Sequence, residues 1–420
     1  MIVQQKILLK LKEEEKRSLD YQSLLCASMY NRLLNYCKDD ENYKSKYIFN
    51  SNGLRNLIVS IKNDHPYYKG CSSYPLRNVA NRLKNAYLSY LKNESGYPRY
   101  FSDCKGWFSL LYDDPNKGVK IKGRGVRISV GSYIIEGRRV SRYIEAKLEV
   151  DVLKNDGIKN YRIVKEHGRY YLCICMQRGN PIKTKMTLKR VAIDPNSSNL
   201  FVAADNDGNS FLMENLSMIN YFSRKIDEVK RKRDKKVKEE INYGDRKIVY
   251  CSRKYRMYDD ALKSIYTKGK EQIMIALNII AKKLVVNYDE IAIGNYVPES
   301  SMASNRVMRR AMLNKSVIGI FRSKLQFYCY KYNKKFIEVD ERYTTMKCPF
   351  CGYMEKKTPD IRQYRCKGCN RVIDRDLGSA INIGIKGNVL SISDYLGKKT
   401  RNPKYTLYYD WKKNKIMKRN

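Results

Sequence analysis

The sequence predicts an α+β protein of several domains, because three hydrophobic patterns follow one another along its 420 residues. Residues 12–104 carry apolar side chains at helical spacing, whereas residues 105–185 consist of short alternating runs separated by glycine. From about residue 186, strand patterns end in carboxylates and surround two Cys-x-x-Cys pairs. These observations predict a helical lobe, a small antiparallel β-barrel and a mixed core that carries a metal-binding insertion.

The charge balance predicts a nucleic-acid partner. The chain holds 84 Lys and Arg against 43 Asp and Glu, a net charge of +41. An enzyme of small metabolites does not need so strong a positive electrostatic field. A long polyanion is a suitable partner, because each phosphate that Lys or Arg neutralises releases counterions and favours binding. No apolar run approaches the ~20 residues that span a bilayer, and the N-terminus lacks a signal-peptide pattern. We therefore expect no membrane. Eight of the twelve cysteines are scattered without the spacing of a disulfide framework, which favours a reducing compartment.

The first half of the chain reads as a strand, two helices and a barrel. Residues 1–11 predict a strand that joins the barrel, followed by a helix to about Cys37, a polar loop through His65 and Pro66, and a second helix from Leu76 to Tyr90. Basic residues on this helix and in the stretch after it are candidate nucleic-acid contacts, although a solvated face is the plainer reading. These candidates are Arg77, Arg82, Lys84 and Arg99.

The second half predicts buried strands separated by long helices. Val191–Asp194 is a buried strand ending in a carboxylate, and a hairpin follows across residues 205–208. Such a strand and hairpin are how an RNase H-like nuclease core begins. A charged helical stretch is predicted over 217–285, and its basic residues Lys230, Arg231 and Arg233 are candidate nucleic-acid contacts. Strands are predicted over 290–293 and from Phe336 towards Glu341, and helices over 307–332 and from Asp376 onward. Residues 388–420 are basic and weakly patterned, so they are predicted to be partly disordered.

Four cysteines predict a structural zinc site. Cys348 and Cys351 form one pair, and Cys366 and Cys369 form the other, with a loop of about fifteen residues between them. Each pair lies on a tight turn that points both sulfurs at one ion. A zinc ribbon fits this spacing better than a pair of disulfides in a chain of this composition.

Carboxylates are the candidate catalytic groups. Only two histidines exist, which excludes much of metal and nucleophile chemistry that depends on imidazole. RNase H-like nucleases hold two divalent ions about 4 Å apart among three or four carboxylates, and magnesium prefers such hard oxygen ligands. Asp194 on the first strand and Asp376 on the last helix occupy two of the required places.

Several motifs resemble one family: the TnpB transposon-encoded nucleases, their eukaryotic and viral relatives called Fanzor, and the compact type V CRISPR effectors. Val191–Pro195 is similar to their first RuvC motif, although Asn196 stands where a glycine usually follows. Asp374–Ile383 resembles their third motif. Further similar stretches are Asn314–Leu325, Val339–Cys351 and the junction Gly96–Tyr100.

The resemblance implies a domain plan. Residues 1–11 and 105–185 would form the wedge barrel, and 12–104 the recognition lobe inserted in it. Residues 186–345 and 374–390 would form the RuvC-like nuclease domain, interrupted by the zinc ribbon at 346–373 and followed by a basic tail at 391–420. It also implies an RNA-guided DNA endonuclease that uses Mg²⁺, a guide RNA and a target DNA with a short adjacent motif, as a monomer in its ribonucleoprotein.

One departure concerns the third acidic residue. Many relatives place a glutamate directly after the strand 290–293, where this chain has Gly294. A branch of TnpB and the Fanzors is similar in lacking it and is thought to take the glutamate from the strand before the ribbon, which is Glu341 here. Neighbouring strands lie ~4.8 Å apart, so a glutamate could reach across. Asp340 and Glu338 are weaker candidates, and Asp374 is a candidate for supporting the site.

Alternatives remain open from the sequence. Glu341 could be a surface carboxylate, which would make the protein an inactive RNA-guided DNA-binding protein. A DNA transposase uses a chemically similar carboxylate triad. The expected location is the nucleus in a eukaryotic or viral setting and the cytoplasm in a bacterial one.

Overall fold

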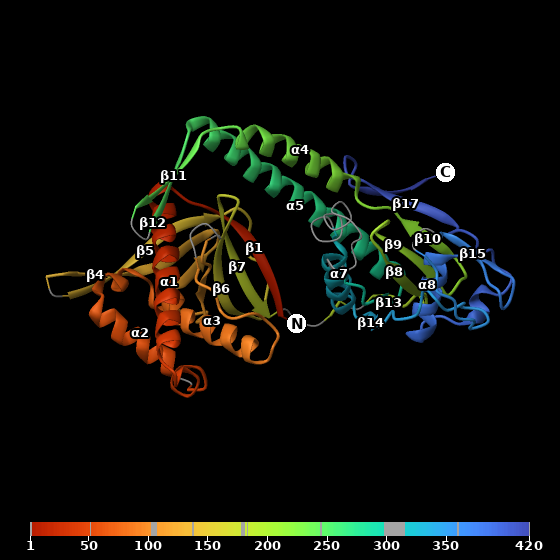
Figure 1. Cartoon of the computed structure of the whole chain (residues 1–420), viewed down its shortest axis with the longest axis horizontal. Coiled ribbons are helices and arrows are strands. Elements are labelled where there is room, and N and C mark those ends of the chain that lie inside the picture. Colours follow the sequence, from red (N-terminus) through yellow and green to blue (C-terminus); the bar gives the residue numbers. More distant parts are fainter. Residues whose placement is uncertain are drawn as a thin grey trace. The chain divides into compact units, whose positions relative to one another are not determined.

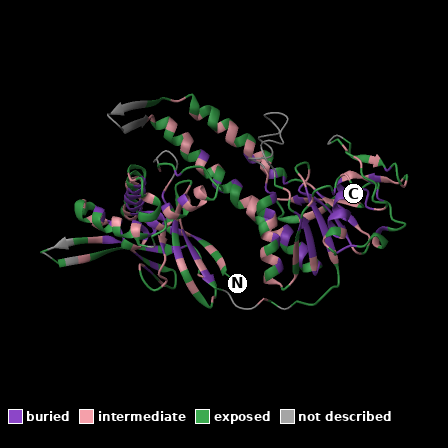
Figure 2. Cartoon of the chain, turned by 60° about the horizontal axis from the view of Figure 1, so that its bottom comes forward, coloured by how far each residue is buried: buried purple, intermediate pink, exposed green. Residues whose placement is uncertain are grey.

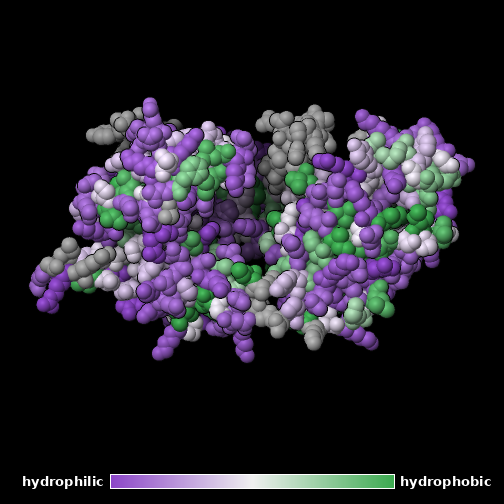
Figure 3. All heavy atoms as spheres, turned by 90° about the horizontal axis from the view of Figure 1, so that it is seen from below, coloured by the Kyte–Doolittle hydropathy of each residue, from purple (hydrophilic) through white to green (hydrophobic). Residues whose placement is uncertain are grey.

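The computed structural model describes residues 2–419 except 51, 102–106, 137, 178–180, 183, 244–245, 298–315 and 359–360. These residues form two compact units, unit 1 from Met1 to Asn180 and unit 2 from Pro181 to Asn420 (Figure 1). Hydrophilic side chains cover most of the face of each unit seen in Figure 3. Across the described residues, no helix combines the length and the apolar character that a membrane crossing requires.

The sheet of unit 1 has seven antiparallel strands in the order β2-β6-β7-β1-β5-β4-β3. The N-terminal strand lies in the middle, paired with β7 from Ile2 to Leu8 and with β5 at Leu9 and Lys10. Hydrogen bonding in the described part of the unit ends at β2 and β3, so the predicted small barrel is a sheet with two free edge strands. Its strands are β1 (Ile2–Lys10), β2 (Leu110–Tyr112), β3 (Val119–Lys122), β4 (Gly125–Ile135), β5 (Arg138–Leu148), β6 (Gly157–Glu166) and β7 (Arg169–Gln177).

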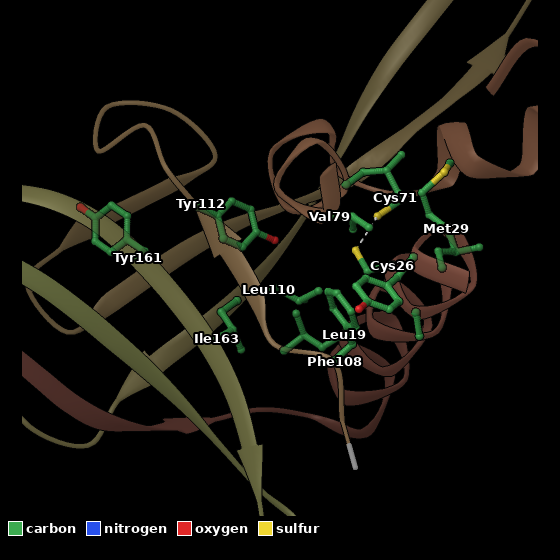
Figure 4. Packing of buried hydrophobic residues seen from close by; sticks show 14 of the residues in the cluster. Leu19, Cys26, Met29, Cys71, Val79, Phe108, Leu110, Tyr112, Tyr161 and Ile163 are labelled. Atoms are coloured by element: carbon green, nitrogen blue, oxygen red, sulfur yellow. Dashed lines mark hydrogen bonds between the residues drawn. The ribbon is translucent and has the colours of Figure 1, made fainter. Parts of the chain in front are cut away.

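Three longer helices share one core with this sheet. They are α1 (Glu13–Asp39), α2 (Gly53–Asp64) and α3 (Ser73–Leu91), with the short helices η1 (Lys44–Ile48) and η2 (Pro66–Gly70) around α2. Leu19, Cys26 and Met29 of α1 are fully buried, at the spacing that places them on one helix face. Figure 4 shows these side chains with Tyr112 of β2 and with Cys71, whose Sγ lies 3.7 Å from that of Cys26.

The predicted polar loop through His65 and Pro66 is wrong over most of its length. Residues 53–64 form α2, because Leu54, Ile58 and Ile61 fall at helical spacing and are buried against the rest of unit 1. Polar side chains between these positions hid the pattern.

The sheet of unit 2 also has seven strands, in the order β14-β13-β8-β9-β10-β17-β18. β8, β13 and β14 run parallel, so their carboxyl ends share one edge, whereas β9 is antiparallel to β8. The strands are β8 (Arg190–Pro195), β9 (Phe201–Asp205), β10 (Ser210–Met213), β13 (Glu290–Gly294), β14 (Lys335–Val339), β17 (Tyr405–Asp410) and β18 (Lys415–Arg419).

Helices cover both faces of this sheet. Val191 and Ile193 pack in one cluster with residues of α5 (Arg253–Asn287) and α7 (Ile318–Lys331). Ala192 points the other way and packs in a second cluster with α8 (Arg375–Lys386). Because both faces are covered, β8 and β9 are buried almost throughout, as the purple strands in Figure 2 show.

Two predictions for unit 2 are corrected. Residues 217–285 are not helical throughout, because a two-stranded hairpin, β11 (Lys238–Tyr243) and β12 (Arg246–Cys251), separates α4 (Ser217–Asp234) from α5. The basic stretch at 388–420 is not weakly structured: it contains η6 (Ile392–Tyr395), and β17 pairs in parallel with β10. Of the predicted helix over 307–332, residues 307–315 lie outside the described residues, and the helix α7 begins at Ile318.

A buried ion pair fixes the start of β13 and β14. Asp289 accepts hydrogen bonds from the backbone N–H groups of Thr187 and Leu188, both at 2.5 Å, and forms an ion pair with Lys334. The side chains of Asp289 and Lys334 are only 7% and 3% exposed. The adjacent pair, Glu290 with Lys335, joins the same two strands at 3.2 Å but is more accessible, with side chains 31% and 60% exposed.

We expect Asp289→Ala to lower the free energy of unfolding by about 3–5 kcal/mol, because it leaves the charge of Lys334 buried and unpaired. Glu290→Ala is the matched control and should change it by less than about 1 kcal/mol, because its pair is exposed. Urea denaturation of the full chain measures both, and equal losses for the two variants would contradict the assignment.

Candidate active site and metal centre

The two cysteine pairs lie on turns of the same construction. In one, the N–H of Gly352 donates to the carbonyl of Cys348 at 3.0 Å; in the other, the N–H of Asn370 donates to the carbonyl of Cys366 at 2.8 Å. Gly352 and Asn370 directly follow the second cysteine of each pair and have φ of +77° and +59°. Glycine and asparagine tolerate this left-handed conformation best, so the sequence itself favours the two turns.

The four sulfurs form a cluster that fits a zinc ion. All lie within 4.8 Å of one another, with 3.8 Å between Cys348 and Cys369 and 3.5 Å between Cys351 and Cys366. Tetrahedral zinc with Zn–S bonds of ~2.3 Å requires sulfurs about 3.8 Å apart. The second turn is held by a small hairpin of β15 (Gln363–Arg365) and β16 (Val372–Asp374). This geometry supports the predicted structural zinc site.

Asp194 lies near the carboxyl end of β8, on the face covered by α8. Its side chain shares that face with Ala192, and Ser379 of α8 donates a hydrogen bond to Asp194 Oδ1 at 3.0 Å. Burial raises the pKa of Asp194 well above its ordinary value, and the negative charges of Asp376 and Glu341 raise it further. Asp376 and Glu341 therefore both lie close enough to Asp194 to repel its carboxylate.

Glu341 occupies the space of a missing side chain at Gly294. β13 and β14 pair in parallel with Gly294 opposite Val339, so Glu341 follows just beyond the end of β13. A Cβ added to Gly294 would lie 2.1 Å from Glu341 Oε2 and 3.2 Å from its Cδ. The carboxylate of Glu341 thus fills the position from which a side chain at residue 294 would extend.

The carboxylate of Glu341 is poorly compensated. Its Oε2 is buried and has no hydrogen-bond partner among the described residues. Burial raises the pKa of Glu341 to about 7, against the opposing charge of Arg322. Buried polar atoms without a partner are rare in proteins, and a cation is the natural partner for an unpaired carboxylate oxygen.

Asp376 stands in the first turn of α8 and is held by two arginines. Arg375 donates to Asp376 Oδ1 from Nε at 3.1 Å and from Nη2 at 3.0 Å. Arg362 directly precedes β15. It donates from Nη1 to Asp376 Oδ2 at 2.9 Å and from Nη2 to Ser198 Oγ at 2.7 Å. The zinc-binding insertion therefore contacts the acidic site directly.

The acidic cluster is looser than the cysteine cluster. In the described part of the chain, the cysteines are the group of potential ligands whose atoms all lie within 4.8 Å of one another. Asp194, Glu341 and Asp376 interact through their charges but do not meet that separation. A single small ion could not bind all three carboxylates as they stand.

The weaker acidic candidates have other partners. Asp374 caps α8, accepting from the N–H of Leu377 at 2.8 Å, and burial raises its pKa. Asp340 is exposed and pairs with Lys386 at 3.4 Å, whereas Glu338 faces Arg322 at 3.6 Å. Among the acidic residues around the ribbon, Glu341 is thus the one directed at Gly294.

Two positioning residues were not identified from the sequence. Arg322 of α7 donates from Nη2 to the carbonyls of Gly294 at 3.0 Å and Tyr296 at 2.6 Å, which fixes the chain where it leaves β13. Asn382 of α8 donates from Nδ2 to the carbonyls of Thr344 and Lys347, both at 2.7 Å. Asn382 lies within the third motif, which is a usable signal, whereas Arg322 lies in an apolar helix and gives none.

The predicted nucleic-acid contacts of unit 1 differ in how free they are. Arg77 forms an ion pair with Asp113 at 3.0 Å, and the guanidinium of Arg82 lies 4.2 Å from the centre of the Phe108 ring. Lys84 is half-buried and Arg99 is exposed. The first two residues therefore have structural partners within the unit.

The basic residues of α4 follow the same division. Arg233 pairs with Asp234 at 2.8 Å and with Asp259 at 3.0 Å, which joins α4 to α5. Lys230 and Arg231 are exposed on the helix surface. Their exposure agrees with a solvated face and with a binding face alike.

Comparison with known families and proteins identifies related chains. The family described as Cas12f1-like, TNB domain, matches residues 319–383, which run from α7 through the ribbon into α8. A relative named "Putative RNA-guided DNA endonuclease InsQ", from Escherichia coli strain K12, is 22% identical over 381 residues, covering 87% of each chain. "TnpB-like protein L79" of Acanthamoeba polyphaga mimivirus is 31% identical over 108 residues, which are 25% of this chain and 21% of that one.

The fold has a solved counterpart. The protein in the cryo-EM structure of the Cas12f1–sgRNA–target DNA complex aligns with a TM-score of 0.57 at 14% identity, over 88% of this chain and 82% of that one. The chain is therefore an α+β multidomain protein whose fold resembles that of the Cas12f1 protein, with a cysteine cluster that fits a zinc ion. The matched domain and the relatives make this chain similar to TnpB-like proteins and to the compact Cas12f1-like type.

We expect the purified chain to contain about one zinc ion, because the four thiolates match its coordination geometry. Cys366→Ser should lose the metal and destabilise the ribbon, whereas Cys175→Ser in β7 should keep it. Elemental analysis together with a thermal melt measures both effects. Full zinc content in Cys366→Ser would contradict the site.

A second prediction concerns the pH dependence of stability. Burial raises the pKa of Glu341 from 4.5 to about 7, so the folded chain binds an extra proton between these values and loses stability as pH rises through that window. Glu341→Gln removes this loss. In a chelator at pH 8 the variant should exceed the wild type by on the order of 1–2 kcal/mol after solvent screening, and the difference should shrink towards pH 5.

Urea denaturation across this pH range measures the difference, with Glu228→Gln on the exposed face of α4 as control. A Glu341→Gln variant that was less stable than the wild type at pH 8 would show that the carboxylate is compensated in the folded chain.

Proposed function

We propose that this protein is an RNA-guided DNA endonuclease. A guide RNA would select the target by base pairing next to a short adjacent motif, and one RuvC-type site would hydrolyse the DNA. The printed name of the InsQ relative and the fold shared with the Cas12f1 protein support this assignment. The net charge of +41 suits a protein that holds a heteroduplex through its backbone while base pairing supplies sequence.

The observation that carries the proposal is the position of Glu341. Its carboxylate fills the space at Gly294, beside the end of the strand after which many relatives carry their glutamate. An acidic group that reaches this place from just beyond β14 would supply the third carboxylate, beside Asp194 of β8 and Asp376 of α8. This is the relocated arrangement that the resemblance to Fanzor and its TnpB branch implied.

The residues fit a pair of magnesium ions better than a single ion. Their oxygens are the hard ligands that magnesium prefers, Glu341 Oε2 has no partner among the described residues, and the three groups are spread too widely for one compact site. Two bound ions would supply an activated hydroxide and stabilise the leaving oxygen. Asp194, Glu341 and Asp376 would hold them.

Other residues of the chain would keep these carboxylates in place. Ser379 orients Asp194 through its hydrogen bond, and Arg375 orients Asp376. Arg322 fixes the backbone at Gly294 and so defines the space that Glu341 enters. Each contact restricts a side chain before substrate arrives, which is the condition for an accurately placed site.

We assign the remaining roles by unit. Unit 1 would hold the guide RNA and the adjacent motif with its wedge-like sheet and its helices, as a monomer in the ribonucleoprotein. Unit 2 would hold the cleavage site, and the zinc ribbon would bring Arg362 beside Asp376. The basic charge of both units would supply the backbone contacts.

The decisive test is cleavage by the ribonucleoprotein purified with its own RNA. We expect Mg²⁺-dependent cutting of a DNA that matches the sequenced guide. Asp194→Ala and Glu341→Gln should reduce the rate by about two orders of magnitude or more while target binding persists, because only the transition state needs the ions. Binding without any cutting by the wild type would favour an inactive guided binding protein, and absence of bound RNA would favour a transposase.

A swap at Gly294 is the matched control for Glu341. Gly294→Ala should impair cleavage, because its Cβ would displace the Glu341 carboxylate. Gly294→Glu combined with Glu341→Gly delivers a carboxylate to the same space from β13 and should recover part of the activity that Glu341→Gly alone loses. Full cleavage by Glu341→Gln would refute the role of this residue.

A further inference from the structure

Unit 1 contains a polar cavity of about 560 Å³. One wall is the turn into α3, with Ser72 and Ser73, and the other is formed by β3, β4 and β5. A cavity of this size exceeds the needs of one water molecule and has room for a small group of a larger ligand.

Close backbone approaches shape the cavity. Gly131 has φ of +104°, and a Cβ there would lie 2.4 Å from the carbonyl oxygen of Gly70. The pairing of β4 with β5 shifts register between Ser129 and Ser132, so the wall bends at this point. The hollow is therefore built by the chain's path and is not a gap between loosely packed side chains.

The charge around the cavity is positive. Lys117, Lys120 and Arg127 line it, and no carboxylate does so among the described residues. Lys120 and Arg127 are directly opposite each other across β3 and β4. Like charges in opposite positions destabilise a strand pair, and an anion between them would remove that repulsion.

Neighbouring carboxylates offset the charge of this group only in part. Asp113 is paired with Arg77, and Asp114 accepts from the N–H of Asn116 at 2.9 Å. Glu145 lies opposite Arg127 in the β4–β5 register and offsets part of its charge from outside the cavity lining.

The uncharged lining suits a phosphate group. Five serines contribute hydroxyl groups, which donate to phosphate oxygens without adding charge. The guanidinium of Arg127 lies 4.2 Å from the centre of the Tyr143 ring, which orients it at the rim. The serines are Ser72, Ser73, Ser129, Ser132 and Ser141.

We propose that this cavity binds a backbone phosphate of nucleic acid held by unit 1. The identity of the polyanion rests on the proposed function. The site itself rests on the two cations that lie opposite each other, on the hydroxyl groups and on a lining without carboxylates among the described residues. The residues differ from all those predicted to contact nucleic acid from the sequence.

The test compares Lys120→Gln, Arg127→Gln and their double variant with Lys122→Gln. Lys122 lies on the same strand and is exposed, but does not line the cavity. Binding of a labelled single-stranded RNA and of a labelled DNA duplex is measured at several salt concentrations. We expect the cavity variants to bind several-fold more weakly, with a salt dependence of log K shallower by about 0.7 per lost phosphate for the RNA and about 0.9 for the DNA duplex.

If the cavity variants show the shallower salt dependence with the RNA, the phosphate belongs to RNA; if they show it with the DNA duplex, it belongs to DNA. Lys120→Gln should also melt at a temperature no lower than the wild type, because it removes a like-charge pair. Salt slopes equal to those of Lys122→Gln, or a clear loss of stability in Lys120→Gln, would overturn the cavity proposal. These results would leave the proposed function standing, whereas failure of the wild type to bind either probe would count against that function itself.

Discussion

The acidic site of unit 2 depends on the absence of a side chain at Gly294. The last residue of β13 lies where any Cβ would collide with the carboxylate of Glu341, so the two residues are coupled by steric exclusion. The rest of the site is built around this packing. Arg322 holds the carbonyl of Gly294, while Ser379 holds Asp194 from the facing helix. In the sequence, Gly294 marks only the absence of a glutamate. In the structure, the same glycine leaves the space that the Glu341 carboxylate occupies.

Charge distribution explains why the site needs arginines as well as acids. Burial raises the pKa of Asp194 at the sheet edge where β8 ends, and the negative charges of Asp376 and Glu341 raise it further. Arg322, Arg362 and Arg375 are directed at this edge from three separate elements and offset part of the repulsion. The balance remains incomplete at Glu341, whose buried oxygen is left for a cation.

Local motifs predicted the site better than the fold around it. The paired cysteines and the aspartates at 194 and 376 follow from residue type and spacing, which are local in sequence. Glu341 required the register of β13 with β14, so the sequence could suggest it only through the resemblance. The role of Arg322 could not be predicted from the sequence, because it depends on the carbonyls of Gly294 and Tyr296 that lie beside α7.

The missed elements have specific physical causes. α2 was hidden by polar residues between Leu54, Ile58 and Ile61, and the hairpin at 238–251 by the charges that flank it. β17 was missed because its strand character comes from pairing with β10 and not from strong alternation of its own. Such pairing between distant segments leaves little trace in either segment alone.

That same distant pairing has a consequence for how the protein matures. β10 pairs with β17, which is almost two hundred residues further along the chain, as the pairing of Phe211 with Tyr405 shows. Asp194 contacts α8 over a similar sequence separation, through its hydrogen bond with Ser379. A nascent chain still threaded through the ribosomal tunnel at these segments has its first aspartate but no assembled catalytic edge. Synthesis itself therefore delays the moment at which the three carboxylates can come together in a newly made molecule.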